Sequence, residues 1–142
     1  MISLKDKLLS LDGFIDNEYL DKYVQLVERN KRTSRRGKDI NSHHIVPRAW
    51  FKIHKQTVDN SLSNLVNLVY RNHTLAHYYL CLCTEGPLQY ANELALILLV
   101  SRKKLNISDR LLVQGLPLYN NIYEDYLQKK QSCYKLYEEI TE

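Results

Sequence analysis

The sequence has little of what disulfide-bonded, secreted or membrane-spanning proteins depend on. Its three cysteines, two in "CLC" and one at Cys133, are an odd number without a disulfide framework, which fits a reducing compartment. The longest apolar run, Leu94–Val100, is far shorter than the roughly 20 residues of a membrane-spanning helix. Lys5, Asp6 and Lys7 lie where a signal peptide has its apolar core. We therefore expect a cytoplasmic protein that does not associate with a membrane.

Internal repeats and low-complexity tracts are absent as well, so the chain has the make-up of an ordinary folded protein. Its 44% apolar and 25% charged residues are near the average for globular proteins, which argues against disorder. A length of 142 residues suits one domain of common size. We predict a single domain over residues 1–142 that belongs to the α+β class and is mostly helical.

The segment "DNEYLDKYVQLVERN" has the periodicity of an amphipathic helix. Asp16 and Asn17 are the candidates for its N-cap. The apolar residues that recur along one face are Leu20, Tyr23, Val24 and Val27. We expect this helix to end near a basic segment that begins at Lys31.

Two later segments also predict helices. The stretch "LQYANELALILLVSRKK" has so much apolar surface that we expect a buried helix, with its terminal cations near the negative end of the helix dipole. Beyond Gly115 and Pro117 a long helix is predicted. The residues that recur seven apart, or in step with that repeat, are Tyr119, Ile122, Tyr126, Cys133, Leu136 and Ile140. This spacing is typical of packing within one domain and also of a seam in a homodimer, and both remain open.

The middle of the chain predicts two short strands followed by a helix. "HHIVPR" is β-branched at its centre and is stopped by Pro47, which indicates a brief strand leading into a turn. "NLVNLV" alternates as a second strand does, and the irregular residues 49–63 predict a long loop between the two. "RNHTLAHYYLCLC" returns to helical spacing and is expected to end at Gly86 and Pro87. The residues expected to face the core from this helix are Leu75, Tyr79 and Leu82.

Four of the five histidines lie in two of these segments, "HHIVPR" and "RNHTLAHYYLCLC". His73 and His77 are four apart and share one helix face, so their imidazoles can converge on one metal ion. His43 and His44 are adjacent on a strand and point to opposite faces unless the strand end is distorted. An imidazole left outside the metal site is a base that titrates near neutral pH and can take a proton from water. A metal ion beside such a base suits hydrolysis of a phosphodiester.

Five cations are clustered in "KRTSRRGKD", just before the histidine pair. They are Lys31, Arg32, Arg35, Arg36 and Lys38. Such a cluster attracts a phosphate backbone, although by itself it is also typical of a solvated loop between two helices. A candidate site for phosphodiester hydrolysis next to it favours DNA binding.

These motifs resemble the core of the HNH endonucleases, or His-Me finger nucleases, especially those of phage and mobile-element type. The resemblance rests on "HHIVPR", "NLVNL" and "RNHTLAHYYL", with the three signature positions of the family at His44, Asn64 and His73. It implies a ββα-metal core with flanking helices. The implied parts are N-terminal helices and basic loop over 1–39, the core over 40–83 and a helical extension over 84–142.

The resemblance implies metal-dependent cleavage of double-stranded DNA, with His44 as the general base. His43, His73 and His77 are expected to hold one divalent metal ion. In this family Asn64 either ligates the metal or braces the loop that carries the base. We favour bracing, because three imidazoles are already available to the metal.

Two arginines are further candidates for contact with the substrate. Arg48 and Arg71 are expected to clamp phosphate, because the planar guanidinium suits that geometry. The identity of the metal ion stays open. Imidazole ligands suit zinc, nickel or manganese, whereas phosphodiester hydrolysis often uses magnesium.

The sequence also departs from the family. Residues 45–63 make a longer loop than usual, and "AWFKIH" stands where a glycine pair often follows the first motif. A nuclease toxin and a catalytically silent, metal-stabilised DNA-binding module therefore remain as alternatives. A closed structural zinc site more often uses cysteines, and an intact His44 argues against the silent module.

Overall fold

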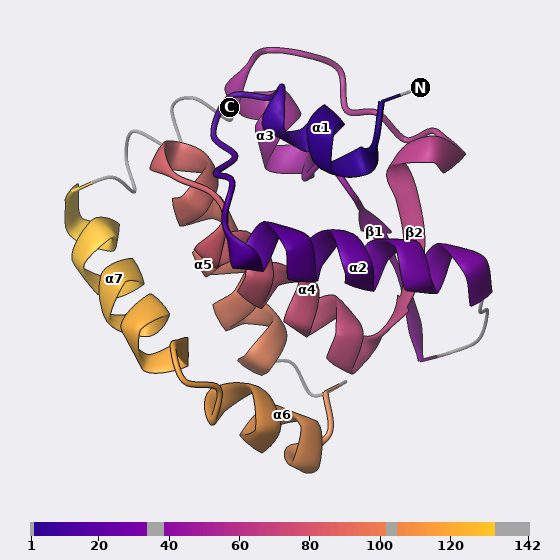
Figure 1. The fold of residues 1–142 in the computed structure, drawn as a ribbon. Coiled ribbons are helices and arrows are strands. Elements are labelled where there is room, and N and C mark those ends of the chain that lie inside the picture. Colours follow the sequence, from indigo (N-terminus) through magenta and orange to yellow (C-terminus); the bar gives the residue numbers. More distant parts are fainter. Residues whose placement is uncertain (1, 34–38, 102–104, 133–142) are drawn as a thin grey trace.

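The structure is a computed structural model, and it describes residues 2–33, 39–101 and 105–132 (Figure 1). In these ranges the fold is α+β and mostly helical, as predicted. The elements are α1 (Leu4–Leu9), α2 (Glu18–Thr33), β1 (Ile40–His44), α3 (Arg48–Ile53), the 3-10 helix η1 (Leu62–Asn64), β2 (Leu65–Val69), α4 (Tyr70–Leu82), α5 (Gly86–Ser101), α6 (Ile107–Gln114) and α7 (Tyr119–Ser132).

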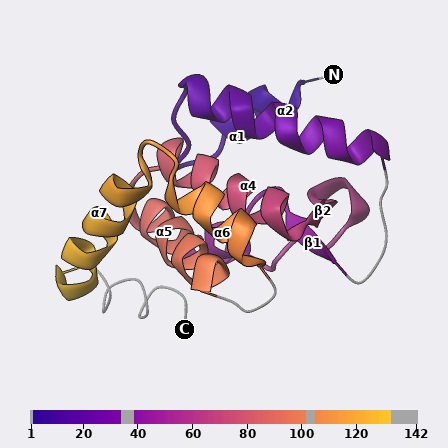
Figure 2. The same ribbon diagram turned by 90° about the horizontal axis from the view of Figure 1, so that it is seen from below.

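Helix α4 lies at the centre of the packing. Figure 2 shows α1 and α2 along one side of α4, and α5, α6 and α7 along the other. The buried apolar side chains accordingly form two clusters, one with α1–α3 and the strands and one with α5–α7. Tyr79 on α4 packs against both clusters. This arrangement holds α4 from two sides and fixes the position of the histidines that it carries.

The amphipathic helix predicted near the N-terminus is confirmed as α2. Its four predicted core residues, Leu20, Tyr23, Val24 and Val27, are all buried. The side-chain oxygen of Asn17 accepts hydrogen bonds from the backbone N–H groups of residues 19 and 20, at 3.0 and 3.2 Å. Asn17 therefore satisfies donors that the first turn leaves free, as an N-cap does.

The two predicted strands are present and pair with each other. β1 and β2 are antiparallel, with His43 opposite Val66 and His44 opposite Leu65. The first strand ends at His44, so Ile45 and the residue after it are not part of it as "HHIVPR" had suggested. Because α4 begins directly after β2, strand and helix histidines come together in one place.

The long loop predicted over residues 49–63 is wrong in part. Residues 48–53 form helix α3, and η1 begins at Leu62. Trp50 and Phe51 are buried on the inner side of α3, and the Trp50 indole N–H donates to the carbonyl of Asp12 at 3.0 Å. Burial of two large aromatic rings stabilises a helix that is too short for its own periodicity to reveal.

The predicted end of α4 is also wrong. Gly86 and Pro87 do not end this helix, which stops at Leu82, but begin α5, where Gly86 has a φ of +66° that favours glycine. The three residues expected to face the core, Leu75, Tyr79 and Leu82, are half-buried and pack against the apolar clusters. The buried residues of α4 are Thr74, Ala76, Tyr78, Leu80 and Cys81. The helix is covered on two sides, so a single apolar stripe does not describe it.

The buried helix predicted after residue 87 is confirmed as α5, and its terminal cations lie outside the described residues. Tyr119, Ile122 and Tyr126 of α7 are buried within the same chain, and the Tyr126 ring stacks on Tyr90 of α5 at 5.6 Å. Cys133, Leu136 and Ile140 lie outside the described residues. The described part of α7 therefore packs within the domain, while the homodimer stays a prediction.

Across the described residues, no helix has both the length and the apolar content that crossing a membrane requires.

Candidate metal centre

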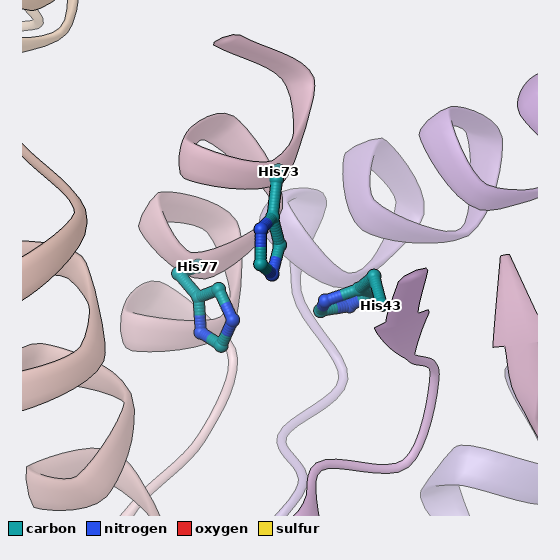
Figure 3. Close-up of side chains that lie close together, drawn as sticks. All are labelled: His43, His73 and His77. Carbon is teal, nitrogen blue, oxygen red and sulfur yellow. The ribbon is translucent and has the colours of Figure 1, made fainter. Parts of the chain in front are cut away.

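Three imidazoles meet where the end of β1 faces α4. His43 comes from the strand, and His73 and His77 come from successive turns of the helix. One possible ligand atom from each lies within 4.8 Å of the others, and every pair of ring centroids is 5.1 Å apart. Figure 3 shows the rings pointing towards one another. The structure thus brings together the three residues predicted as metal ligands.

A buried tyrosine determines which nitrogen of His43 is free. The Tyr23 hydroxyl must donate to the carbonyl of Ile45 at 2.6 Å, because a carbonyl only accepts. The Tyr23 oxygen, 2.8 Å from Nε2 of His43, therefore accepts from that N–H. Burial raises the pKa of Tyr23 well above its usual value, so the hydroxyl stays neutral. His43 is left with a lone pair on Nδ1.

His73 is oriented in a similar way by a neighbour on β1. Its Nδ1 lies 3.0 Å from the side-chain oxygen of Asn41, which only accepts, so Nδ1 carries the proton and Nε2 the lone pair. Asn41 and His43 are two apart on the strand and share the face that meets α4. Such hydrogen bonds fix tautomer and ring orientation in metal-binding histidines.

His77 is the least satisfied of the three. Its Nδ1 is buried and has no hydrogen-bond partner among the described residues. The Asn92 side chain favours the protonated ring, but no hydrogen bond of ordinary geometry joins the two. A buried polar atom without a partner costs free energy, and a bound ion in the site would supply interactions to the ring.

The surroundings disfavour the charged form of two of the three imidazoles. Burial, and then the neighbouring histidines, lower the pKa of His43 well below its usual value. Burial and His73 lower the pKa of His77 to about 3. Neutral imidazoles are the form that binds a metal ion. The donor set, its spacing and the neutral form of His43 and His77 therefore fit a divalent metal ion, and the described residues contain no other group of three candidate ligands with this spacing.

The fourth histidine of the motif lies beside the cluster and does not join it. Nε2 of His44 lies 2.7 Å from the side-chain oxygen of Asn60. Since that oxygen only accepts, Nε2 carries a proton, and in the neutral ring the lone pair is therefore on Nδ1. His44 lines the same cavity as the three clustered histidines. The end of β1 at His44 thus allows adjacent histidines to serve one cavity.

Asn64 braces the backbone that follows His44. Its side-chain oxygen accepts from the N–H of Val46 at 2.8 Å, and its amide nitrogen donates to the carbonyl of Asp59 at 3.0 Å. Asn64 is 1% exposed, and its backbone carbonyl also accepts from the N–H of Ile45 at 2.8 Å. With its amide so engaged, the geometry favours the bracing role over the ligand role.

The three clustered histidines and His44 line a cavity of about 380 Å³ between β1, α3, α4 and α5. Its lining consists of Ser42, His43, His44, Pro47, Arg48, Ala49, His73, His77, Ala91, Asn92, Leu94, Ala95 and Leu98. Arg48 is exposed and is the cation of this lining. It is therefore placed to reach an anion that sits over the clustered histidines.

Of the other predicted phosphate contacts, those that the structure describes do not line the cavity. The Arg71 guanidinium lies 3.9 Å from a carboxylate oxygen of Asp109, and Arg71 is not among the lining residues. The Lys31 ammonium donates to the carbonyl of Leu62 at 3.2 Å, and Arg32 is exposed near the end of α2. The remaining members of the basic segment, Arg35, Arg36 and Lys38, lie outside the described residues.

Three residues that orient the histidines were not identified from the sequence. Tyr23 had been recognised only as a core residue, and Asn60 lies in a polar loop with no pattern to distinguish it. Asn41 carried a usable signal, because residues two apart on a strand share a face. Tyr23 and Asn60 reach the histidines from distant positions in the chain, and sequence spacing does not encode such contacts.

Comparison of the chain with protein-family models, with curated proteins and with solved structures found no match.

Proposed function

We propose that the chain is a metal-dependent endonuclease of the HNH type, which hydrolyses DNA phosphodiester bonds. In this proposal β1, β2 and α4 form the ββα-metal core, and His43, His73 and His77 hold one divalent ion. The observation that carries the proposal is the pairing of two kinds of imidazole on one cavity. Three converge with ligand atoms within 4.8 Å of one another, and the fourth, His44, lines the same cavity without joining them and is held through Nε2 by Asn60.

The polar residues at and beside the cavity can each be assigned a role in phosphodiester hydrolysis. His44 takes a proton from water at Nδ1 while the water oxygen forms a bond to phosphorus and the bond to the leaving oxygen breaks. Hydrogen bonding to Asn60 and bracing by Asn64 hold His44 in place for that transfer. Arg48 binds phosphate oxygens that do not react. A bound divalent ion would offset the negative charge that develops on the phosphate and on the leaving oxygen.

The open side of the site argues for chemistry and against a purely structural metal. Structural zinc sites are closed by four protein ligands, whereas catalytic sites keep a position open beside three. Here the three clustered histidines line a cavity, and within the described residues no fourth His, Cys, Asp or Glu joins them. Three neutral imidazoles suit zinc, nickel or manganese, and magnesium is the hard-ion alternative to test beside them.

The test is cleavage of supercoiled plasmid by wild type and by His44→Ala, with EDTA or with Mg²⁺, Mn²⁺, Zn²⁺ or Ni²⁺. We expect nicked product only with metal, and a loss of about 10²–10⁴-fold in His44→Ala, as for removal of a general base. Metal content of the variant should equal that of wild type, because His44 does not belong to the cluster.

His54→Ala is the matched control. His54 donates from Nδ1 to the carbonyl of Trp50 at 2.8 Å and stacks on the Trp50 ring, away from the cavity lining. It should nick at the wild-type rate. Equal nicking by wild type and His44→Ala would remove His44 as the base. Folded, metal-loaded protein that cleaves no DNA would leave the silent DNA-binding module as the better account.

A further inference from the structure

Opposite the histidines, the cavity has an apolar wall that phosphate chemistry does not require. It consists of one stripe of α5 at helical spacing: Ala91, Leu94, Ala95 and Leu98. Pro47 and Ala49 continue the apolar lining from the start of α3. The lining thus combines the imidazoles, Arg48 and the polar side chains of Ser42 and Asn92 with a hydrocarbon stripe from α5.

The wall is open to a ligand. Leu98 is 50% exposed, and Leu94 and Ala95 are half-buried. By contrast, Leu96 on another face of α5 is fully buried in the core. Ala91 and Ala95 are small and one turn apart, so the hollow lies over them with leucines beside it. Exposed apolar surface next to a few convergent polar groups is typical of a ligand-binding pocket.

The volume and the lining of the cavity limit the kind of ligand that it can bind. A volume of about 380 Å³ is in the range of pockets for small molecules, which corresponds to one nucleotide and not to a double helix. In a duplex the faces of each base are covered by stacking and its edge by pairing. Only an unpaired base can lay its flat face on an apolar wall.

We propose that the α5 wall is a subsite for the base of an unpaired nucleotide, so that the DNA is cut where it is single-stranded. This inference rests on the proposed function and makes its substrate narrower than double-stranded DNA in general. The phosphate of that nucleotide faces the histidine cluster and Arg48, while its base packs on Leu94, Ala95 and Leu98.

The experiment uses a labelled DNA hairpin with a loop of thymidines, and a blunt duplex of the stem sequence, with Mn²⁺. We expect cleavage in the hairpin loop to be at least tenfold faster than cleavage in the hairpin stem or in the blunt duplex. Leu98→Gln should slow loop cleavage about tenfold, in line with loss of an apolar contact from a pocket. Ala95→Leu should do the same by filling the hollow. Binding of Co²⁺, followed by its absorption spectrum, should be unchanged in both variants.

Leu111→Gln is the matched control, because Leu111 on α6 is 63% exposed and does not line the cavity. Loop and duplex cleaved at equal rates, or full activity in Leu98→Gln and Ala95→Leu, would overturn the subsite and leave the nuclease standing. Failure to cleave hairpin, duplex or plasmid would overturn both proposals. Cleavage of phosphatidylcholine vesicles in place of DNA would also overturn both, since a phospholipid combines the same phosphodiester with apolar chains.

Discussion

At the scale of single residues, the hydrogen bonds behind the histidines determine what the cluster can bind. An imidazole offers a metal ion only the nitrogen that carries no proton, and the partner of the other nitrogen decides which one that is. Tyr23 makes this choice for His43, and Asn41 makes it for His73. Both partners are neutral, so they fix the tautomer without adding charge to the site.

Tyr23→Phe tests the contribution of this orientation. The variant keeps the ring but removes the acceptor for Nε2–H of His43, so the choice of tautomer is lost. We expect metal affinity to fall about 10–100-fold, as for other residues that orient a ligating histidine. A competition titration with a chromophoric chelator measures the change.

Tyr19→Phe is the control for this prediction, because Tyr19 lies one turn earlier on the same helix and is half-buried. It should bind metal as wild type does. If Tyr23→Phe kept wild-type affinity while remaining folded, the hydroxyl would have no role in orienting His43.

The candidate ligands were predictable from the sequence and their orienting partners were not. His73 and His77 share a helix face by spacing alone, and the HNH resemblance added His43. Tyr23, the partner of His43, comes from α2, and Asn60, the partner of His44, comes from the loop after α3. Both contacts depend on tertiary packing. Asn64 was expected to brace the loop because three imidazoles were already available, and its hydrogen bonds to residues 46 and 59 fit that role.

At the scale of elements, the contact between α5 and α7 contains a buried carboxyl group. Glu93 is 1% exposed, and burial, with the nearby Asp125 carboxyl as a second cause, raises its pKa to about 8. The Lys129 ammonium lies 3.5 Å from Glu93 and 2.8 Å from Asp125, and it donates to Gln89 at 2.7 Å. At neutral pH the protonated form of Glu93 therefore dominates in the folded protein.

The raised pKa of Glu93 links stability to pH. The folded state holds this proton more tightly than the unfolded state, in which the pKa is near 4.5. Its contribution is therefore complete below about pH 4.5 and is lost as pH rises through about 8. We expect the free energy of unfolding to fall by an amount on the order of 1–3 kcal/mol between pH 6 and 9, measured by urea denaturation.

Glu93→Gln should lose this decline, because the amide does not titrate. The lowered pKa values of His43 and His77 make stability rise with pH near 6.5 in both proteins, so the difference between wild type and Glu93→Gln isolates the contribution of Glu93. Glu124→Gln, an exposed change on α7, should keep the wild-type pH dependence. A difference between wild type and Glu93→Gln that is constant from pH 6 to 9 would show that Glu93 is ionised in the folded protein throughout.

The elements themselves were predicted unevenly, for physical reasons. Helices α2 and α5 are long enough for periodicity or apolar content to identify them. Helix α3 has six residues and is stabilised by two buried rings and a hydrogen bond to Asp12, which a local pattern does not show. For α4, burial on two sides removes the single stripe that the spacing of Leu75, Tyr79 and Leu82 had suggested.

At the scale of the whole molecule, the candidate centre lies where the two apolar clusters meet. The orienting Tyr23 belongs to the cluster formed with α2, while Leu96 and Val100 of α5, the helix that carries the apolar wall, belong to the cluster formed with α6 and α7. Helix α4 contributes to both clusters and carries two of the three histidines. The sequence predicted the helical content but not this arrangement, since contact between α4 and α5 depends on three-dimensional packing.

The charge of the whole chain bears on how DNA would reach that cavity. A net charge of +4 is modest, so attraction to a phosphate backbone depends on where the cations are concentrated. Five of the 20 lysines and arginines lie within the nine residues of "KRTSRRGKD". Phosphate contacts of this kind give affinity without sequence preference and release counterions on binding.

Replacing Arg35 and Arg36 by Gln tests this attraction. We expect weaker binding to two unrelated DNA sequences by the same factor, and a slope of log affinity against log salt that is smaller by about 2, because each lost phosphate contact removes roughly 0.9. Fluorescence anisotropy between 50 and 200 mM salt measures both quantities. Replacing Lys22 and Arg29 on α2 by Gln removes the same charge from exposed positions outside that segment and should leave the slope nearly unchanged. Equal effects of the two double variants would mean that net charge alone attracts DNA, and no effect of either would remove the basic segment from the binding surface.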